Sequence, residues 1–309
     1  MSGIGVVLNP FSKKYKKNPD KLNHMAFIIG DKASCKPTDD LDDLYRVAEE
    51  FKTRNIDVLA ISGGDGTIHC TLTTFINVYG EKPLPKIYFL RGGTLNTIAA
   101  TMGIKGNTEK LMSDLLIRYH EDRPFDHRKL RLTKINNEYG CIFGMGVIFN
   151  FMDFYYSYPQ LNPYIAAKAL VRSILSAACN GKLIQKMFKR FDADVYVNGQ
   201  KWPFANYTAV FSGSIRQLGL DFNVFNSMLT QNELFHAIGM SLTPHQTLML
   251  LKKLHDGTPS GDPGLVEGPA QTMEIICAEP MPFTIDGDMI DRGVKEFKLS
   301  VGPEITVLV

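Results

Sequence analysis

The sequence predicts an α/β + β protein: an N-terminal α/β domain with a parallel sheet, then a C-terminal β-sandwich domain with inserted helices. Three observations support this. The chain has 309 residues, and domains of roughly 100 to 150 residues are the commonest size, so two domains are expected. Residues 1–126 alternate short β-branched runs with longer helical patterns, which is typical of βαβ units. Residues 127–309 are mostly strand-like, and we place the domain boundary between these segments.

The first domain is expected to contain three strands and three helices. The strand at 4–8 ends at Asn9-Pro10, and the helix at 41–54 carries apolar residues at helical spacing. The other expected elements are a strand at 56–61, a helix at 67–78, a strand at 86–90 and a helix at 108–119. A glycine pair follows each of the last two strands, so a tight turn is expected at both places.

The second domain is expected to contain eight short strands. These are 129–133, 140–143, 193–197, 208–211, 272–277, 282–285, 297–301 and 305–309, and the last one is a candidate to pack back on the first domain. Asn198-Gly199 and Asp286-Gly287 are hairpin signals. Helices are expected at 164–179 and 244–254, and a surface loop at 260–268.

Composition and charge exclude several classes of protein. With 44% hydrophobic and 21% charged residues, the chain is neither disordered nor a coiled coil. Lysine and arginine exceed acidic residues by only two, which gives no reason to expect nucleic-acid binding. The five cysteines are far apart and predict no disulfide framework. There is no secretory signal pattern and no apolar run of the ~20 residues that cross a bilayer, so we expect a cytoplasmic protein.

The most informative segment is the glycine cluster Gly63-Gly64-Asp65-Gly66-Thr67, between a buried strand and a helix. Glycine lets the backbone approach a ligand closely, and the amides and dipole of a helix N-terminus attract an anion such as a phosphate. The alternative is a strand-to-helix turn that needs glycine for its geometry alone.

Two further polar turns favour the phosphate interpretation. Gly92-Gly93-Thr94-Leu95-Asn96 follows the next strand, and Asn9-Pro10-Phe11-Ser12 ends the first one. All three turns lie at the C-terminal ends of predicted parallel strands, where open α/β sheets bind their ligands.

These motifs, together with Asp286-Gly287-Asp288, occur in the order and approximate spacing of the diacylglycerol kinase catalytic family, which the chain resembles over nearly its whole length. The G-G-D-G-T element is shared with NAD kinases and phosphofructokinases, whereas G-T-x-N-x-x-A points to lipid kinases. The resemblance implies a nucleotide-binding domain, a β-sandwich domain, an active site between them, ATP with Mg²⁺, and phosphorylation of a lipid hydroxyl.

The resemblance also implies roles for individual residues. The expected nucleotide contacts are Asn9, Ser12, Gly63, Gly64, Gly66, Thr67 and Thr94, with Asn96 supporting its loop. The resemblance implies that Asp65 belongs to the metal and phosphate network. From its position in the glycine cluster, Asp65 either reaches Mg²⁺ directly or through water or holds the loop by hydrogen bonds. Asp286 and Asp288 match an acidic element of the family whose last residue accepts the proton of the lipid hydroxyl, so Asp288 inherits that role. From spacing alone, a plain hairpin turn is the alternative for this pair.

The chain departs from the family pattern at several positions. Arg91-Gly92 precedes Gly93 where the family has P-x-G, and Thr97 replaces an aspartate after Asn96. Arg91 is either a further phosphate contact or a solvated or ion-paired side chain. The bacterial members' D-D-G-x-L stretch, which supplies a structural metal, aligns with residues 230–234, whose sequence T-Q-N-E-L predicts no such metal.

A basic stretch lies between Asp153 and Asp192, which enclose six lysines and arginines and no acidic residue. In the helix at 164–179, the apolar residues Ala167, Leu170, Val171, Ile174 and Ala178 share one face, and aromatic rings lie just upstream. The alternatives are that this face packs on the sandwich or that residues 154–191 bind an anionic membrane surface.

We therefore expect an ATP-dependent lipid kinase that acts on a diacylglycerol-like or sphingoid lipid, functions in phospholipid metabolism and associates peripherally with the inner membrane face. One alternative is a kinase for a soluble metabolite such as NAD. Another is a catalytically silent homologue that binds lipid or nucleotide. The acceptor lipid and the oligomeric state stay open at this point.

Overall fold

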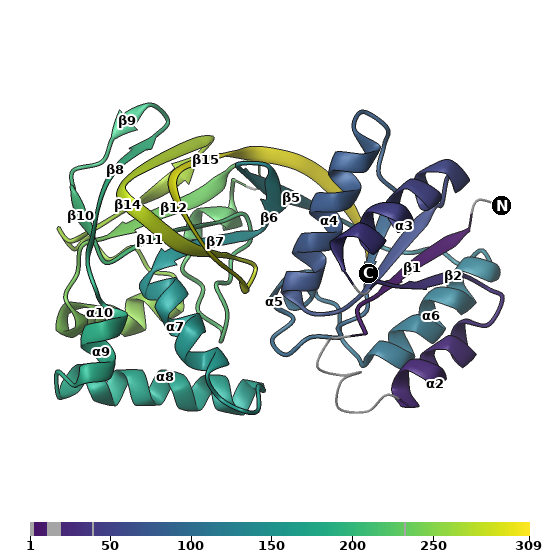
Figure 1. Cartoon of the computed structure of the whole chain (residues 1–309), viewed down its shortest axis with the longest axis horizontal. Coiled ribbons are helices and arrows are strands. Elements are labelled where there is room, and N and C mark those ends of the chain that lie inside the picture. Colours follow the sequence, from purple (N-terminus) through teal and green to yellow (C-terminus); the bar gives the residue numbers. More distant parts are fainter. Residues whose placement is uncertain (1–2, 11–19, 39, 232) are drawn as a thin grey trace. The chain divides into compact units, whose positions relative to one another are not determined.

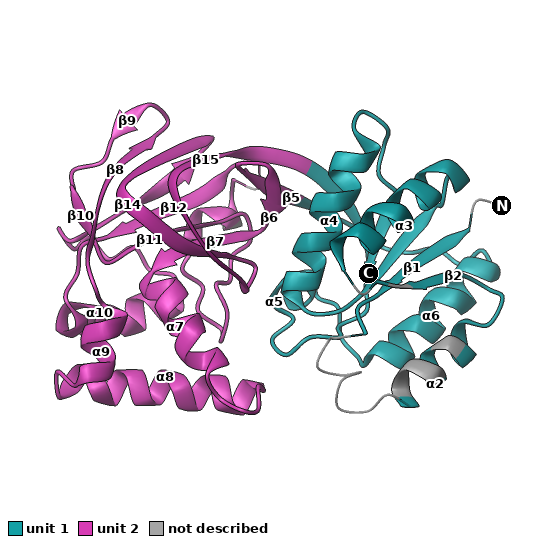
Figure 2. Ribbon diagram, viewed as in Figure 1, with its two compact units in different colours: residues 1–130, 304–309 teal, residues 131–303 magenta. Residues whose placement is uncertain are grey.

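The computed structural model describes residues 3–10, 20–38, 40–231 and 233–309. These divide into two compact units, residues 1–130 with 304–309 (unit 1) and residues 131–303 (unit 2), which Figure 2 shows in teal and magenta. The expected boundary at 126 lies four residues before the observed one. The expected fold class is confirmed: a parallel α/β sheet is followed by a largely antiparallel, β-rich region.

Unit 1 is built on a parallel sheet in the order β15-β4-β3-β1-β2. The strands are β1 (Ile4–Leu8), β2 (Ser34–Pro37), β3 (Val58–Ser62), β4 (Lys86–Phe89) and the end of β15 (Asp288–Leu308), which pairs with β4 through Val307 and Ile87. β1 and β3 are buried along their whole length, as continuous apolar strands between two helical layers should be.

Within the described residues, five helices accompany this sheet. They are α2 (Asp20–Ile29), α3 (Leu41–Arg54), α4 (Asp65–Tyr79), α5 (Thr97–Thr101) and α6 (Thr108–His120). α3 packs beside α4 and α2 beside α6 (Figure 1). No sequence pattern predicted α2, β2 or α5, whereas α3 has the predicted bounds.

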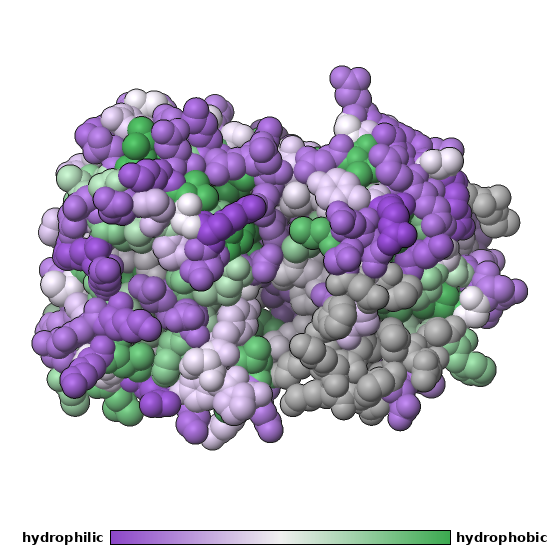
Figure 3. All heavy atoms as spheres, in the orientation of Figure 1, coloured by the Kyte–Doolittle hydropathy of each residue, from purple (hydrophilic) through white to green (hydrophobic). Residues whose placement is uncertain are grey.

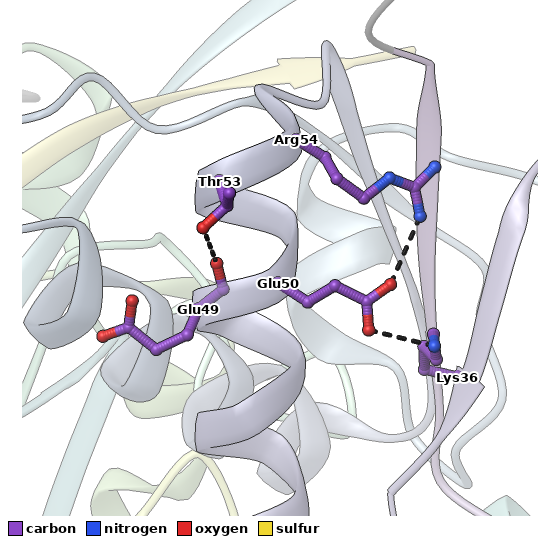
Figure 4. Close-up of polar contacts among 5 residues, drawn as sticks. All are labelled: Lys36, Glu49, Glu50, Thr53 and Arg54. Carbon is purple, nitrogen blue, oxygen red and sulfur yellow. Dashed lines mark hydrogen bonds and ion pairs between the residues drawn. The ribbon is translucent and has the colours of Figure 1, made fainter.

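The caps and charges of α3 explain why this helix was predictable. The Asp40 side chain accepts a hydrogen bond from the backbone N–H of Asp43, and Asn55 ends the helix in the left-handed conformation. Glu50 accepts from Lys36 of β2 at 2.9 Å and from Arg54 at 3.4 Å (Figure 4). Since both cations favour the ionised carboxylate, the pKa of Glu50 is lowered.

Unit 2 contains an antiparallel sheet in the order β13-β12-β11-β7-β14-β15. Its strands are β5 (His127–Ile135, which begins in unit 1), β6 (Glu138–Gly140), β7 (Ile142–Gly146), β8 (Phe191–Val197), β9 (Gln200–Lys201), β10 (Asn206–Tyr207), β11 (Ala209–Gly213), β12 (Phe235–Met240), β13 (Leu265–Ala270), β14 (Thr272–Ile285) and most of β15. β8 pairs with β14, β9 and β10, and β5 pairs with β6 and β15. Phe143, Phe283 and Phe297 contact one another in the core.

The helices of unit 2 are α7 (Val147–Tyr156), α8 (Pro163–Ala178), α9 (Lys182–Met187) and α10 (Pro244–Asp256), with the short 3₁₀ helix η1 at Asn226–Leu229. The expected loop at 260–268 is partly wrong, because residues from Leu265 onward pair with β12 as β13. The two strands expected at 272–277 and 282–285 form the single strand β14, whose register shifts between Ile276 and Phe283. None of the described helices is long and apolar enough to span a bilayer.

Candidate active site

The two glycine turns of unit 1 pack against each other through their backbones. One turn follows β3 at Gly63-Gly64, and the other follows β4 at Gly92-Gly93, where the Gly92 N–H donates to the Gly63 carbonyl at 2.8 Å. A Cβ on Gly93 would lie 2.2 Å from Gly64 Cα, and one on Gly92 would lie 2.9 Å from Gly63 N. Both distances are shorter than real Cβ contacts, so glycine is required here by the approach of two chain segments.

Helix α4 starts directly at the first glycine turn. Its N-cap is Gly64, which has no side chain to bind the first-turn amides, and the structure shows no side-chain hydrogen bond at this cap. The helix has 15 residues, enough for aligned peptide dipoles to leave partial positive charge at this end. The arrangement suits a bound anion.

Asn9 and Thr67 join the first polar turn to this helix. The Asn9 Nδ2 donates to Thr67 Oγ1 at 3.0 Å, and the Asn9 backbone N–H donates to the Ser62 carbonyl at 3.1 Å. A Cβ on Gly63 would lie 2.3 Å from Thr67 Cβ, so the turn and the first turn of α4 are in close contact. Ser12, also expected to contact the nucleotide, lies outside the described residues.

The carboxylate of Asp65 caps the short helix α5 that follows the second glycine turn. It accepts from the backbone N–H of Thr97 at 2.9 Å and of Ile98 at 3.2 Å. Burial raises the pKa of Asp65, and the two amides and the nearby Arg91 guanidinium act in the opposite direction. Asp65 therefore connects the two turns, which agrees with the alternative that it holds the loop by hydrogen bonds. The amides that it binds are more than 30 residues away, so the sequence did not identify them.

Asn96 closes the second turn on itself. It adopts a left-handed conformation with φ 52°, and its side chain accepts from the Gly93 N–H at 2.9 Å and donates to the Gly93 carbonyl at 3.0 Å. Asparagine tolerates this conformation better than most residues. Thr94 lies half-buried in the same turn.

In unit 2, Asp286 and Gly287 form the hairpin turn between β14 and β15, with φ of 50° and 81°. The buried Asp286 carboxylate accepts from the backbone N–H groups of Cys141 and Ile142 at 2.8 to 3.1 Å. The Asp286 carboxylate is thus bound by backbone N–H groups at the start of β7, and these hydrogen bonds hold the turn in place. Asp288, half-buried, is the first residue of β15.

Tyr156 also holds this turn. Its hydroxyl donates to the Gly287 carbonyl at 2.7 Å, which ties the end of α7 to the hairpin. From the sequence, Tyr156 was expected only as one of several aromatic residues upstream of the helix at 164–179 that could contact a membrane interface. A contact over 131 positions leaves no local signal that would have found it.

The basic stretch of unit 2 lies on α7, α8 and α9. The buried residues of α8 are Ala166, Ala169 and Ser173, whereas Val171 and Leu175 are 53% and 62% exposed. Of the predicted apolar face, Leu170 and Ile174 are half-buried, whereas the other members are exposed: Ala167, Val171 and Ala178. Small residues are the fully buried part of α8, and Val171 and Leu175 are large aliphatic side chains that stay exposed.

Exposed cations occur in the same segment of the chain as these apolar side chains. All four lysines of the stretch are exposed: Lys168, Lys182, Lys186 and Lys189. Arg172 lies over the rings of Phe154 and Tyr158 and donates to the Tyr158 hydroxyl at 2.8 Å. Figure 3 shows hydrophobic atoms in green beside hydrophilic ones in purple over the region of α8 and α9.

Comparison with known proteins agrees with this architecture. Residues 3–128 match the family model of the diacylglycerol kinase catalytic domain. The chain is 30% identical over 138 residues to proteins named diacylglycerol kinase from Staphylococcus aureus, strains JH9 and Newman among them. The aligned part covers 43% of this chain and 40% of the length of these relatives.

Solved structures from Bacillus anthracis str. Sterne are similar over 99% of this chain and 96% of their own. One protein, provisionally named a diacylglycerol kinase, matches with a TM-score of 0.72 at 15% identity. A second, named as diacylglycerol kinase, matches with a TM-score of 0.65 at 14% identity. At these identities the similarity demonstrates the two-part fold. The comparisons thus show that residues 3–128 are similar to the diacylglycerol kinase catalytic domain and that the whole chain shares its fold with the solved structures.

Proposed function

We propose that this protein is an ATP-dependent lipid kinase, which transfers the γ-phosphoryl group to the hydroxyl of a diacylglycerol-like or sphingoid lipid. The observation that carries the proposal is the contact of two glycine turns at the start of α4, where any Cβ on Gly93 would meet Gly64. Such a turn presents backbone amides to a phosphate without side chains in between. ATP in this site and a lipid acceptor are what the similarity of residues 3–128 to the diacylglycerol kinase catalytic domain implies.

The nucleotide phosphates fit the turns of unit 1. We assign phosphate contacts to Gly63, Gly64, Gly66, Thr67 and Thr94, with Asn9 orienting Thr67 and Asn96 holding the second turn. Asp65 would hold Mg²⁺ directly or through water, since each carboxylate oxygen keeps a second lone pair beside its amide bond. When bound, Mg²⁺ offsets negative charge on the phosphates during transfer.

The acceptor hydroxyl must lose its proton as it attacks in line with the leaving group. We propose that a carboxylate oxygen of Asp288 accepts this proton. Asp286 and Tyr156 then act as positioning residues, because they hold the turn that carries Asp288 through amide and carbonyl bonds. In this assignment Asp288 is the general base, and the residues that position it take no part in the proton transfer.

The lipid substrate resides in a membrane, and the surface of α8 and α9 has the chemistry to meet it. Its exposed apolar side chains, such as Leu175 and the 76% exposed Tyr164, can enter the interface. Its four exposed lysines are attracted to anionic headgroups, at about 1 kcal/mol each near the surface. We place the protein at the cytoplasmic face of the membrane, bound peripherally and more weakly at high salt.

The proposal is tested by following ATP consumption with a panel of lipids, with NAD and without acceptor. A total lipid extract is then incubated with protein and Mg²⁺-ATP, and the phosphorylated product is identified by mass spectrometry. We expect one class of lipid to gain a phosphate. Phosphorylation of NAD alone would instead indicate a metabolite kinase, and binding of ATP without turnover on any acceptor would indicate a silent homologue.

A further inference from the structure

Arg91, between β4 and the second glycine turn, has an unusual backbone. Its φ of 46° is left-handed, and of the ten described non-glycine residues with positive φ, eight are asparagine or aspartate. Arginine has no short side chain to favour this conformation, which costs roughly 1 to 3 kcal/mol elsewhere. Leu220, the other exception, adjoins Asp221 in a loop of unit 2.

Three hydrogen bonds hold the Arg91 backbone in this conformation. The Leu90 N–H donates to the Ile61 carbonyl at 2.9 Å, and the Gly92 N–H donates to the Gly63 carbonyl at 2.8 Å. The Thr108 hydroxyl donates to the Arg91 carbonyl at 3.3 Å. Because strained residues persist only where their surroundings determine them, and because they gather at functional sites, this position calls for a functional explanation.

The Arg91 side chain lacks the partners that a structural arginine would have. Its Nε is buried and finds no hydrogen-bond partner among the described residues, and no ion pair between described residues includes Arg91. The guanidinium lies close enough to Asp65 to lower the pKa of that carboxyl, but the Asp65 oxygens accept from Thr97 and Ile98. An unpaired, covered donor costs free energy unless a ligand satisfies it.

We propose that the guanidinium of Arg91 binds a phosphate group of the nucleotide held by the two glycine turns. This inference rests on the ATP binding proposed above and adds a phosphate ligand to it. A guanidinium presents planar, permanently charged donors that match phosphate oxygens in pairs. The α4 dipole acts at the same place with the same sign, so the anion is attracted by two independent groups.

The competing explanation is that the Arg91 charge only stabilises the turn by its proximity to Asp65. The two explanations differ in the nucleotide-free protein. If Arg91 serves the ligand, its replacement by asparagine, which tolerates the left-handed conformation, leaves thermal stability unchanged or increases it. If Arg91 serves the fold, the same replacement lowers Tm.

The test compares Arg91→Asn and Arg91→Lys with Arg46→Gln, a control that removes an equal charge from an exposed position on α3. Binding of Mg²⁺-ATP and of adenosine is measured by titration calorimetry, and Tm is measured without nucleotide. We expect Arg91→Asn to weaken ATP binding at least about tenfold, with adenosine binding and Tm retained. Arg91→Lys should fall between this variant and wild type, and Arg46→Gln should match wild type.

Three results would overturn the assignment: Arg91→Asn binding ATP as tightly as wild type, adenosine and ATP losing affinity equally, or a lower Tm in Arg91→Asn that accounts for the loss. If wild-type protein binds no ATP while remaining folded, the proposed function itself fails. The wild-type titration therefore separates failure of the kinase proposal from failure of the Arg91 assignment.

Discussion

Substitution of Gly93 by alanine tests the glycine turns most directly. The added Cβ would lie 2.2 Å from Gly64 Cα, whereas ordinary contacts begin at 3.4 Å, so one of the two backbones must move by about 1.2 Å (3.4 − 2.2). No flexible side chain is there to yield, because the atom that is met belongs to the other turn. Displacements of about 1 Å at a binding site typically cost on the order of a hundredfold in rate.

We expect Gly93→Ala to bind Mg²⁺-ATP about ten- to a hundredfold more weakly, because at least one amide loses its hydrogen bond to a charged phosphate. Overpacking should also lower the free energy of unfolding by about 1 to 3 kcal/mol. Calorimetric titration measures the first effect and thermal unfolding followed by circular dichroism measures the second.

Two further alanine variants show whether the loss of ATP affinity depends on how close the added Cβ lies to its neighbour. At Gly64 the added Cβ would lie 3.1 Å from Gly93 Cα, so a smaller loss is expected. At Gly268 in β13 nothing lies within 4 Å, so ATP affinity and Tm should stay as in wild type. The reasoning is refuted if Gly93→Ala matches Gly268→Ala in both measurements.

Four further predictions concern unit 2 and α3. Asp288→Asn should retain ATP affinity and lower turnover about a hundredfold or more in a radiolabelled transfer assay. Asp286→Asn should lower Tm, because an amide donor replaces an oxygen that accepts from buried N–H groups. The expected loss in the free energy of unfolding is about 1 to 3 kcal/mol. Serine at both Val171 and Leu175 should reduce co-sedimentation with anionic vesicles several-fold, since both side chains are exposed and apolar. Because the pKa of Glu50 is lower in the folded protein than its ordinary value of 4.5, the ionised carboxylate stabilises the fold above pH 4.5. This stability is lost as the pH falls through the pKa of the folded state, so Tm should fall less steeply below pH 4.5 in Glu50→Gln than in wild type.

Each of these predictions has a contrary result. Normal turnover in Asp288→Asn would remove that carboxylate from the mechanism, and an unchanged Tm in Asp286→Asn would mean that its amide bonds contribute little. Vesicle binding that ignores salt and lipid charge would exclude electrostatic docking by α8 and α9. Parallel acid-unfolding curves for wild type and Glu50→Gln would show that screening by solvent cancels the ion pairs of this half-exposed group.

The elements predicted correctly carry their signals locally. Helix α3 has an aspartate cap, a left-handed asparagine at its end and apolar residues at helical spacing between them. The turn at Asn198-Gly199 has the positive φ angles that this pair favours. The glycine turns were also predictable, since several glycines between a buried strand and a helix have few explanations other than a tight turn or a close approach to a ligand.

What the sequence alone determined, then, is the alternation of strands and helices in unit 1 apart from α2, β2 and α5, the β-rich character of unit 2 and the segments that could bind phosphate. Contacts between distant residues decided the rest. Helix α5 forms where Asp65 caps it from 32 positions away, and β13 forms where a glycine-rich segment meets β12. Likewise, only the folded chain shows Asp286 bound to amides and the Nε of Arg91 without a hydrogen-bond partner among the described residues, because hydrogen bonding depends on which groups are near in space.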